Sequence, residues 1–321
     1  MSEPAPPPTT PPQQLQPPRP WRWRDWFSAS ARRDAIELFM LPGLAAILPW
    51  RLAFAVLRWL AFHWRYPYRP TVEAAWQQAL ARGQVQPGQQ RVWQAERRLV
   101  TLVDHADMYL SLTRQPRRYM ARWLQASGQW SPPSQAAVLV TFHWGAGMWG
   151  LHHARAAGLQ PVALIEALNP GHFPGRPLLY HYARWRIGQV RKALGQAPVD
   201  ISQSLRPILQ ALRAQQQVLV VADVPADRAG SSISVEFAGQ RTQVPRALLK
   251  LMAQQRIPVC YYITGIDLLT GRRFVRMQEL GSFDDAEALA AALFARLDGL
   301  MAEKNAAWHL WDQAPRFWGD P

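Results

Sequence analysis

The sequence contains little cysteine and little lysine, and each shortage excludes a class of protein. Cys260 is the only cysteine in 321 residues, so the chain can form neither an internal disulfide nor a cysteine-based zinc site. A reducing compartment is therefore expected. Lysine occurs only at Lys192, Lys250 and Lys304, and the remaining basic residues, out of 36 Lys and Arg, are all arginine. Arginine binds phosphate and carboxylate groups through a planar fork of donors that stays charged.

Several motifs that would identify a catalytic class are also missing. There is no Gly-x-x-x-x-Gly-Lys phosphate loop and no Gly-x-Ser-x-Gly nucleophile elbow. His152 and His153 have no partner pattern for zinc, and neither pairs with His143 at the helical spacing of a metalloprotease. We therefore predict no metal and no cofactor.

The charge balance predicts polyanionic partners. Asp and Glu number only 22, which leaves a net charge of +14. Nucleic acid, an anionic membrane surface and a phosphorylated substrate all fit this charge. Sixteen tryptophans favour the membrane surface, because indole rings settle at the level of the lipid headgroups. The chain carries no recognisable nucleic-acid-binding motif, so we expect no nucleic acid partner.

The N-terminal part of the chain changes composition at residue 21. Residues 1–20 are mostly Pro, Gln and Thr and lack the features of a secretory signal, so we predict a disordered tail. Residues 21–27 (WRWRDWF) then alternate aromatic and basic side chains. Two interpretations stay open: a helix start with solvated arginines, or an interfacial anchor with its rings at headgroup depth.

The most apolar segment, residues 35–62, is too interrupted for a clean membrane span. Its longest uncharged run is Leu38 to Trp50, whereas a spanning helix needs about 20 apolar residues. Pro42 and Pro49 argue against one straight helix. We expect short helices lying in one leaflet, with Arg51 and Arg58 on one helical face, and we assign residues 21–70 to a membrane-associating helical region. Buried helices of a soluble core are the alternative.

Beyond residue 70 a helical region is followed by a region in which strands and helices alternate. Residues 71–125 have helical spacing, and the Pro-rich turn at 131–134 ends them. Four continuous apolar runs follow that are typical of buried strands, and helical stretches separate or follow them; residues 235–237 and 274–278 are further candidate strands. We predict strands at 136–142, 161–165, 218–222 and 258–264, and helices at 178–194, 204–215, 246–255 and 286–304. This order predicts an α/β fold over residues 71–321, with a mainly parallel central sheet flanked by helices.

Two residues at predicted strand ends are candidates for a site, because open α/β sheets bind ligands beyond the carboxyl ends of their strands. His143 follows the first strand in the sequence Thr-Phe-His-Trp-Gly-Ala-Gly, and a neutral imidazole there could accept a proton from a hydroxyl. Asp223 follows another strand on the same edge. A structural histidine and a turn aspartate are the alternatives.

A basic stretch lies between these two residues in the sequence. It contains Arg176, Arg184, Arg186 and Arg191. One interpretation is that these side chains form a solvated basic face. The other is that they bind a phosphorylated headgroup or the phosphate of an acyl carrier.

The order of these features resembles the lipid A biosynthesis acyltransferases, the late lauroyl and myristoyl transferases of Gram-negative bacteria. The resemblance covers roughly residues 138–317. The family pattern consists of a strand followed by a histidine, a strand ending in Pro-Asp, a Phe-Gly turn with Thr and a helix, and a C-terminal Trp-rich pattern. Its matches in this chain are His143, Val218–Asp223, Ser231–Gly239, Thr242, Pro245, Asn305–Trp311 and Arg316-Phe317.

One position departs from the family pattern. The family has a histidine, four residues and then an acid, and this chain has Met148 where the acid would stand. That acid would orient the imidazole and stabilise its protonated form. Glu166 and Asp223 are the candidates to replace it. The family's site arginine corresponds best to Arg186 and next to Arg184.

The resemblance implies a membrane-associated O-acyltransferase. It would move a fatty acyl group from an acyl carrier protein thioester to a hydroxyl of a lipid A precursor or a similar anionic glycolipid, at the cytoplasmic face of the bacterial inner membrane. His143, Asp223 and Glu166 would be the catalytic candidates, and Cys260 is a poor nucleophile. The substrate would contact a further set of residues: Arg176, Arg184, Arg186, Trp144, Gly145 and Met148. The alternative is a catalytically impaired homologue that binds lipid or a partner in envelope assembly.

Overall fold

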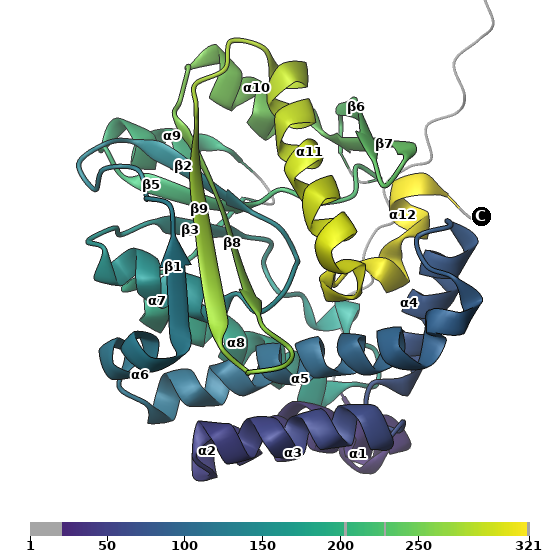
Figure 1. The fold of residues 1–321 in the computed structure, drawn as a ribbon. Coiled ribbons are helices and arrows are strands. Elements are labelled where there is room, and N and C mark those ends of the chain that lie inside the picture. Colours follow the sequence, from purple (N-terminus) through teal and green to yellow (C-terminus); the bar gives the residue numbers. More distant parts are fainter. Residues whose placement is uncertain (1–20, 202–203, 228, 320–321) are drawn as a thin grey trace, which may run out of the picture.

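Strands and helices alternate along most of the chain in the computed structural model, which describes residues 21–201, 204–227 and 229–319. The predicted tail, residues 1–20, lies outside the described residues. The seven-stranded sheet has the order β1-β9-β8-β2-β5-β3-β4, and only the β8–β9 pair is antiparallel (Figure 1). Its strands are β1 (Leu124–Ser127), β2 (Ala137–Thr141), β3 (Val162–Ile165), β4 (Val199–Asp200), β5 (Gln217–Val221), β8 (Val259–Ile266) and β9 (Arg273–Gly281). A separate hairpin consists of β6 (Ser232–Phe237) and β7 (Gln240–Pro245).

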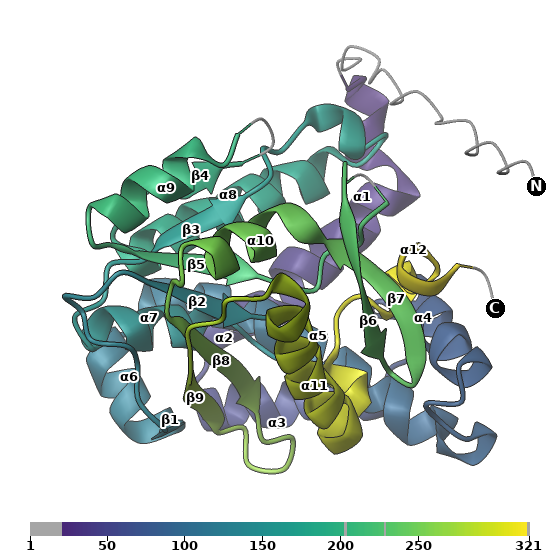
Figure 2. The same ribbon diagram turned by 90° about the horizontal axis from the view of Figure 1, so that it is seen from above.

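Helices cover both faces of this sheet, as the view from above shows (Figure 2). Alternate residues of a strand point to opposite faces. Val138 and Val218 pack in the core that also holds α9, α10 and α11, whereas Leu139 and Leu219 pack against residues of α5, α7 and α8. The helices are α4 (Arg69–Ala81), α5 (Gln90–Thr113), α6 (Pro116–Trp123), α7 (Met148–Ala156), α8 (Pro177–Leu194), α9 (Arg206–Arg213), α10 (Arg246–Gln254), α11 (Ala286–Lys304) and α12 (Pro315–Trp318).

The mainly parallel α/β fold and its predicted strands and helices are confirmed to within a few residues at their ends. One boundary is wrong: the helical pattern does not continue to residue 125, because Leu124 begins β1. Leu124 pairs with Arg273 at the edge of the sheet. This pairing partner lies about 150 residues away in the sequence, so the local pattern could not indicate the strand.

The N-terminal segment forms helices that lie along α5 (Figure 1). These are α1 (Ala29–Asp34), a π-helix (Ala35–Met40), α2 (Leu41–Ile47) and α3 (Trp50–His63). None of the helices in the described part of the chain is both long enough and apolar enough to cross a bilayer.

The π-helix explains how the chain passes Pro42. Proline has no N–H and its ring collides with the carbonyl four residues earlier in a regular helix. In the π-helix the N–H of Leu41 donates five residues back, to the carbonyl of Ile36. The hydroxyl of Tyr68 donates to the carbonyl of Glu37, and the hydroxyl of Tyr109, from α5, donates to that of Leu38 at 2.7 Å. The widened turn therefore anchors the N-terminal helices to the rest of the molecule.

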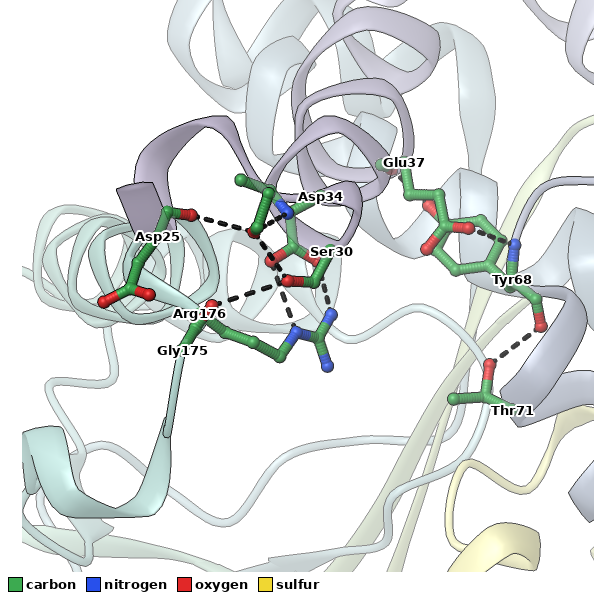
Figure 3. A network of polar contacts seen from close by, with 10 residues as sticks. Asp25, Ser30, Asp34, Glu37, Tyr68, Thr71, Gly175 and Arg176 are labelled. Carbon is green, nitrogen blue, oxygen red and sulfur yellow. Dashed lines mark hydrogen bonds and ion pairs between the residues drawn. The ribbon is translucent and has the colours of Figure 1, made fainter. Parts of the chain in front are cut away.

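A second set of polar contacts ties α1 to the beginning of α8 (Figure 3). Asp34 is buried and forms an ion pair with Arg176, the residue before α8. Ser30 donates a hydrogen bond to the carbonyl of Gly175. Figure 3 also shows the link from the π-helix to the residue before α4: Glu37 accepts a hydrogen bond from the backbone N–H of Tyr68 at 2.7 Å.

The alternative of buried helices describes one face of α3, whereas the membrane association of residues 21–70 stays a prediction. In α3 one face is buried in the main core through Trp50, Phe54 and Leu57. The opposite face is exposed and apolar at Leu52 and Trp59. Arg51 and Arg58 are both exposed, and their guanidinium groups lie over the rings of Trp123 and Phe62.

Candidate active site

A histidine and an aspartate meet where two neighbouring parallel strands end. Thr141 is paired with Val221 at the ends of β2 and β5. His143 and Asp223 each follow two residues later, so the strand register brings them side by side. Nδ1 of His143 lies 3.0 Å from Oδ1 of Asp223. The predicted convergence of these two residues at one edge of the sheet is therefore observed.

The carboxylate of Asp223 is fully buried and accepts hydrogen bonds from three donor groups. The backbone N–H of His143 donates to it at 2.9 Å, and its imidazole donates from Nδ1. The indole Nε1 of Trp308 donates to Oδ2 at 2.8 Å. These donors fix the carboxylate in place, and the carboxylate in turn holds the imidazole in the tautomer that carries its proton on Nδ1.

The imidazole of His143 is accessible on its other side. Its side chain is 43% exposed, and no described residue forms a hydrogen bond to Nε2. Burial lowers the pKa of His143, but the charge and hydrogen bonds of Asp223 raise it by more, so the net pKa lies above its usual value. In its neutral form, with the proton on Nδ1, this ring has an unprotonated Nε2 that can accept a proton from a neighbouring group.

The loop after His143 is held by the C-terminal segment of the chain. Trp144 forms a β-bridge with Trp308, and the N–H of Gly145 donates to the carbonyl of Ala307. Gly145 has φ +71°, and a Cβ there would lie 2.3 Å from the carbonyl oxygen of Thr264. Only glycine fits this position without a shift of the backbone.

His309 holds the same loop through two hydrogen bonds to its backbone carbonyls. Its backbone N–H donates to the carbonyl of His143 at 2.6 Å, and its Nε2 donates to the carbonyl of Gly145 at 2.6 Å. Nδ1 then accepts a hydrogen bond from Arg97 of α5. Burial, followed by the charge of Arg97, lowers the pKa of His309 to about 4, so this ring is neutral at pH 7.

Asp104 of α5 holds Arg186, whose charge affects His143. Arg186 forms a two-pronged ion pair with Asp104, with N–O distances of 2.7 and 3.1 Å. The Arg186 side chain remains 37% exposed. Its charge is close enough to oppose protonation of His143. The place of Arg186 in the site stays a prediction, supported by this effect of its charge on the pKa of His143.

The other predicted site residues are distributed unevenly. Glu166 is exposed at the end of β3, and β5 lies between β3 and β2, so Glu166 follows a strand that is not adjacent to that of His143. Met148 is 4% exposed and packs in an apolar cluster. Arg176 is engaged by Asp34, and Arg184 is exposed with its guanidinium over Tyr180.

A small cavity lies beside the same loop. Its volume is about 150 Å³. Trp144 and Gly145 form one wall, so the cavity is adjacent to the backbone that carries His143. The other lining residues are Val100, Ile266, Leu268, Phe274, Arg276, Glu303, Lys304 and Ala307.

Sequence reasoning did not assign a role to Trp308, His309 or Asp104. Trp308 and His309 belong to the C-terminal pattern that carries the family resemblance, but nothing local relates them to a strand end 165 residues earlier. Asp104 lies within an ordinary amphipathic helix, and only its contact with Arg186 distinguishes it.

Comparison of the chain with protein-family models and with curated proteins found no match. The resemblance to the acyltransferases stays a prediction from the sequence. The function is therefore inferred from the geometry of the site.

Proposed function

We propose that this protein is a membrane-associated O-acyltransferase that moves a fatty acyl group from an acyl carrier protein to a hydroxyl of a lipid A precursor or a similar glycolipid. The single observation that carries the proposal is the His143–Asp223 pair, with Nδ1 of the imidazole held and its side chain accessible. Asp223 supplies the carboxylate that the family pattern would have at position 148. The departure at Met148 is then compatible with catalysis.

The pair can perform the reaction without a covalent enzyme intermediate. Nε2 of His143 takes the proton from the acceptor hydroxyl as its oxygen attacks the thioester carbonyl. Asp223 stabilises the imidazolium that forms. When the tetrahedral intermediate collapses, the C–S bond breaks, and the imidazolium returns the proton to the carrier's sulfur. The products are the ester and the free carrier thiol.

Arg186 supplies the positive charge that this step needs. Negative charge develops on the carbonyl oxygen of the thioester in the tetrahedral intermediate, and a fixed cation nearby lowers that barrier. Asp104 holds the guanidinium so that it does not have to reorganise during the reaction.

The distribution of exposed apolar side chains supports membrane association. Large hydrophobic side chains at 23, 26, 27, 39, 40, 47, 52, 56, 59, 64 and 66 are exposed, against four in the remaining described residues. Exposed apolar surface rimmed by arginine is typical of helices that lie in a membrane interface. The net charge of +14 suits both an anionic membrane and an acidic carrier protein.

A second candidate function is that of a catalytically impaired homologue that binds lipid or an envelope-assembly partner. The apolar burial of Met148 favours it, because the family's acid is absent and nothing polar replaces it at that position. The two candidates differ in whether His143 is needed for product formation.

Incubation of the purified protein with radiolabelled acyl carrier protein and a membrane lipid extract tests both candidates. Wild type should form labelled lipid, and His143→Ala and Asp223→Asn should lose it. His172→Ala, which changes an exposed histidine outside the hydrogen-bonded cluster, should match wild type. Equal product from wild type and His143→Ala would refute the enzymatic proposal. Lipid binding without any product would favour the second candidate.

A further inference from the structure

A second cavity, remote in sequence from His143, has arginine at half of its lining positions. It lies between α4, the first half of α5 and the segment that precedes α4, and its volume is about 370 Å³. Small-molecule sites commonly have volumes of about 300–1,000 Å³. The lining residues are Arg65, Arg69, Val72, Glu73, Gln90, Arg91, Gln94 and Arg98.

The four arginines of this cavity outnumber the acidic residues that line it. No carboxylate of a described residue forms an ion pair with Arg65, Arg69, Arg91 or Arg98. Glu73 is the only acid in the lining, and its two oxygens accept hydrogen bonds from the side-chain amides of Gln77 and Gln94. Four arginines against one glutamate give the lining a net positive charge that no ion pair among the described residues balances.

Arg98 is the most buried of the four arginines, so its charge is the one that an anion would stabilise most. It is 4% exposed, and one of its terminal nitrogens donates to the carbonyl of Ala61 at 2.6 Å. Its Nε is buried and has no partner among the described residues. Burial lowers the pKa of Arg98, and the charge of Arg65 lowers it further, whereas the charge of Glu73 opposes this shift only in part. Burying a guanidinium beside another cation is costly unless an anion compensates it.

We propose that this cavity is a phosphate-binding site separate from the His143 site. Guanidinium groups match phosphate oxygens with paired, charge-assisted hydrogen bonds, so several arginines around one cavity suit a phosphate better than a single carboxylate. A bound phosphate would give the donors of Arg98 a partner and reduce the repulsion between Arg98 and Arg65.

The surroundings of the cavity indicate where such a phosphate could come from. Arg65 lies between Trp64 and Tyr66, whose rings stack with a centroid distance of 5.7 Å and are both exposed. Trp59, four residues before the end of α3, is also exposed and stacks on His63. Exposed aromatic rings next to arginine suit the headgroup layer of a membrane, so an anionic lipid can present its phosphate here. A soluble phosphate compound offers the same chemistry.

Binding can be measured in two arms that separate these sources. The first arm titrates inorganic phosphate into the full-length protein by calorimetry, with chloride at equal ionic strength as the reference. The second arm measures sedimentation with vesicles of phosphatidylcholine alone or mixed with phosphatidic acid. Neither arm depends on acyl transfer, so the result is independent of the function proposed above.

The variants are chosen to remove charge without disturbing the core. Arg69→Gln/Arg91→Gln changes two exposed lining residues, and Arg206→Gln/Arg213→Gln removes the same charge from exposed positions on α9. Loss of two phosphate contacts should weaken binding by at least about tenfold in the first double variant. The α9 double variant should bind as wild type does.

The two arms give distinct outcomes. Tighter binding to phosphatidic acid vesicles that requires Arg69 and Arg91 supports the site and identifies a lipid source. Binding of inorganic phosphate alone, with the same dependence, supports the site and identifies a soluble source. Absence of binding in both arms, or an equal loss in the two double variants, would overturn the proposal. Thermal unfolding of each variant checks that it is folded.

Discussion

Nδ1 of His143 lies 3.0 Å from Oδ1 of Asp223, although the two residues are 80 positions apart in the sequence. The contact results from strand order. Because β2 and β5 are adjacent and parallel, residues at the same distance beyond their paired ends lie side by side. The site is thus built on two of the central strands of the sheet.

The first prediction concerns the pH dependence of acyl transfer. Because Asp223 raises the pKa of His143, kcat/KM should increase with pH through a midpoint above 6.5, as the imidazole loses its proton. In Asp223→Asn the opposing effect of burial prevails, so the midpoint should move to lower pH while the maximal rate falls by roughly a hundredfold or more. Initial rates over a pH series measure both values. An unchanged midpoint in Asp223→Asn would contradict the assigned role.

The second prediction tests the hydrogen bond from Trp308. Trp308→Phe removes the donor to Oδ2 of Asp223, so we expect kcat to fall by about tenfold with little change in KM. The less restrained carboxylate should raise the pKa of His143 and shift the pH midpoint upward. Trp311→Phe is the matched control, since Trp311 is also fully buried but donates to the carbonyl of Asn305. Equal effects of the two substitutions would indicate a packing role only.

The third prediction concerns Met148, where the family resemblance would have an acid. Met148→Glu should not increase the rate, because Asp223 already occupies the hydrogen-bonding position on Nδ1. The new carboxylate would be buried in an apolar cluster, so the free energy of unfolding should fall by about 2 kcal/mol or more. Met148→Leu keeps the volume and polarity and should cost less than about 1.5 kcal/mol. Urea unfolding and initial rates test this prediction, and a faster Met148→Glu enzyme would contradict it.

The fourth prediction is a pH-dependent stability. Burial raises the pKa of Glu37 from 4.5 to about 7, against the opposing hydrogen bond from Tyr68 and the charge of Arg33. The folded protein therefore holds this proton more tightly than the unfolded chain, and the free energy of unfolding should fall as pH rises from 4.5 to about 7.

Substitution of Glu37 isolates this contribution. Glu37→Gln keeps an oxygen that can accept from Tyr68 N–H but removes the titration, so at pH 8 it should be more stable than wild type by up to about 3 kcal/mol. The two proteins should converge near pH 4.5. Urea unfolding at several pH values measures the difference, with Glu236→Gln as an exposed control. Parallel curves for wild type and Glu37→Gln would disprove this assignment.

The sequence by itself determined most of the fold. The buried strands are continuous apolar runs, and the helices between them have helical spacing, so local composition was sufficient to predict the α/β alternation. It also placed His143 and Asp223 after strands, because each follows an apolar run directly.

Only the tertiary structure decided which acid forms a hydrogen bond with the imidazole of His143. Glu166 and Asp223 both follow predicted strands, and β3 comes before β5 in the sequence. In the sheet β5 lies between β2 and β3, which puts the end of β3 two strand spacings, or about 10 Å, from that of β2. Strand order depends on how the crossover helices pack, and that is not encoded in any one segment. For the same reason the sequence did not single out Trp308 or Arg98. Trp308 matters because it donates to Asp223, which is distant in the sequence. Arg98 matters because it is buried, and its Nε has no partner among the described residues.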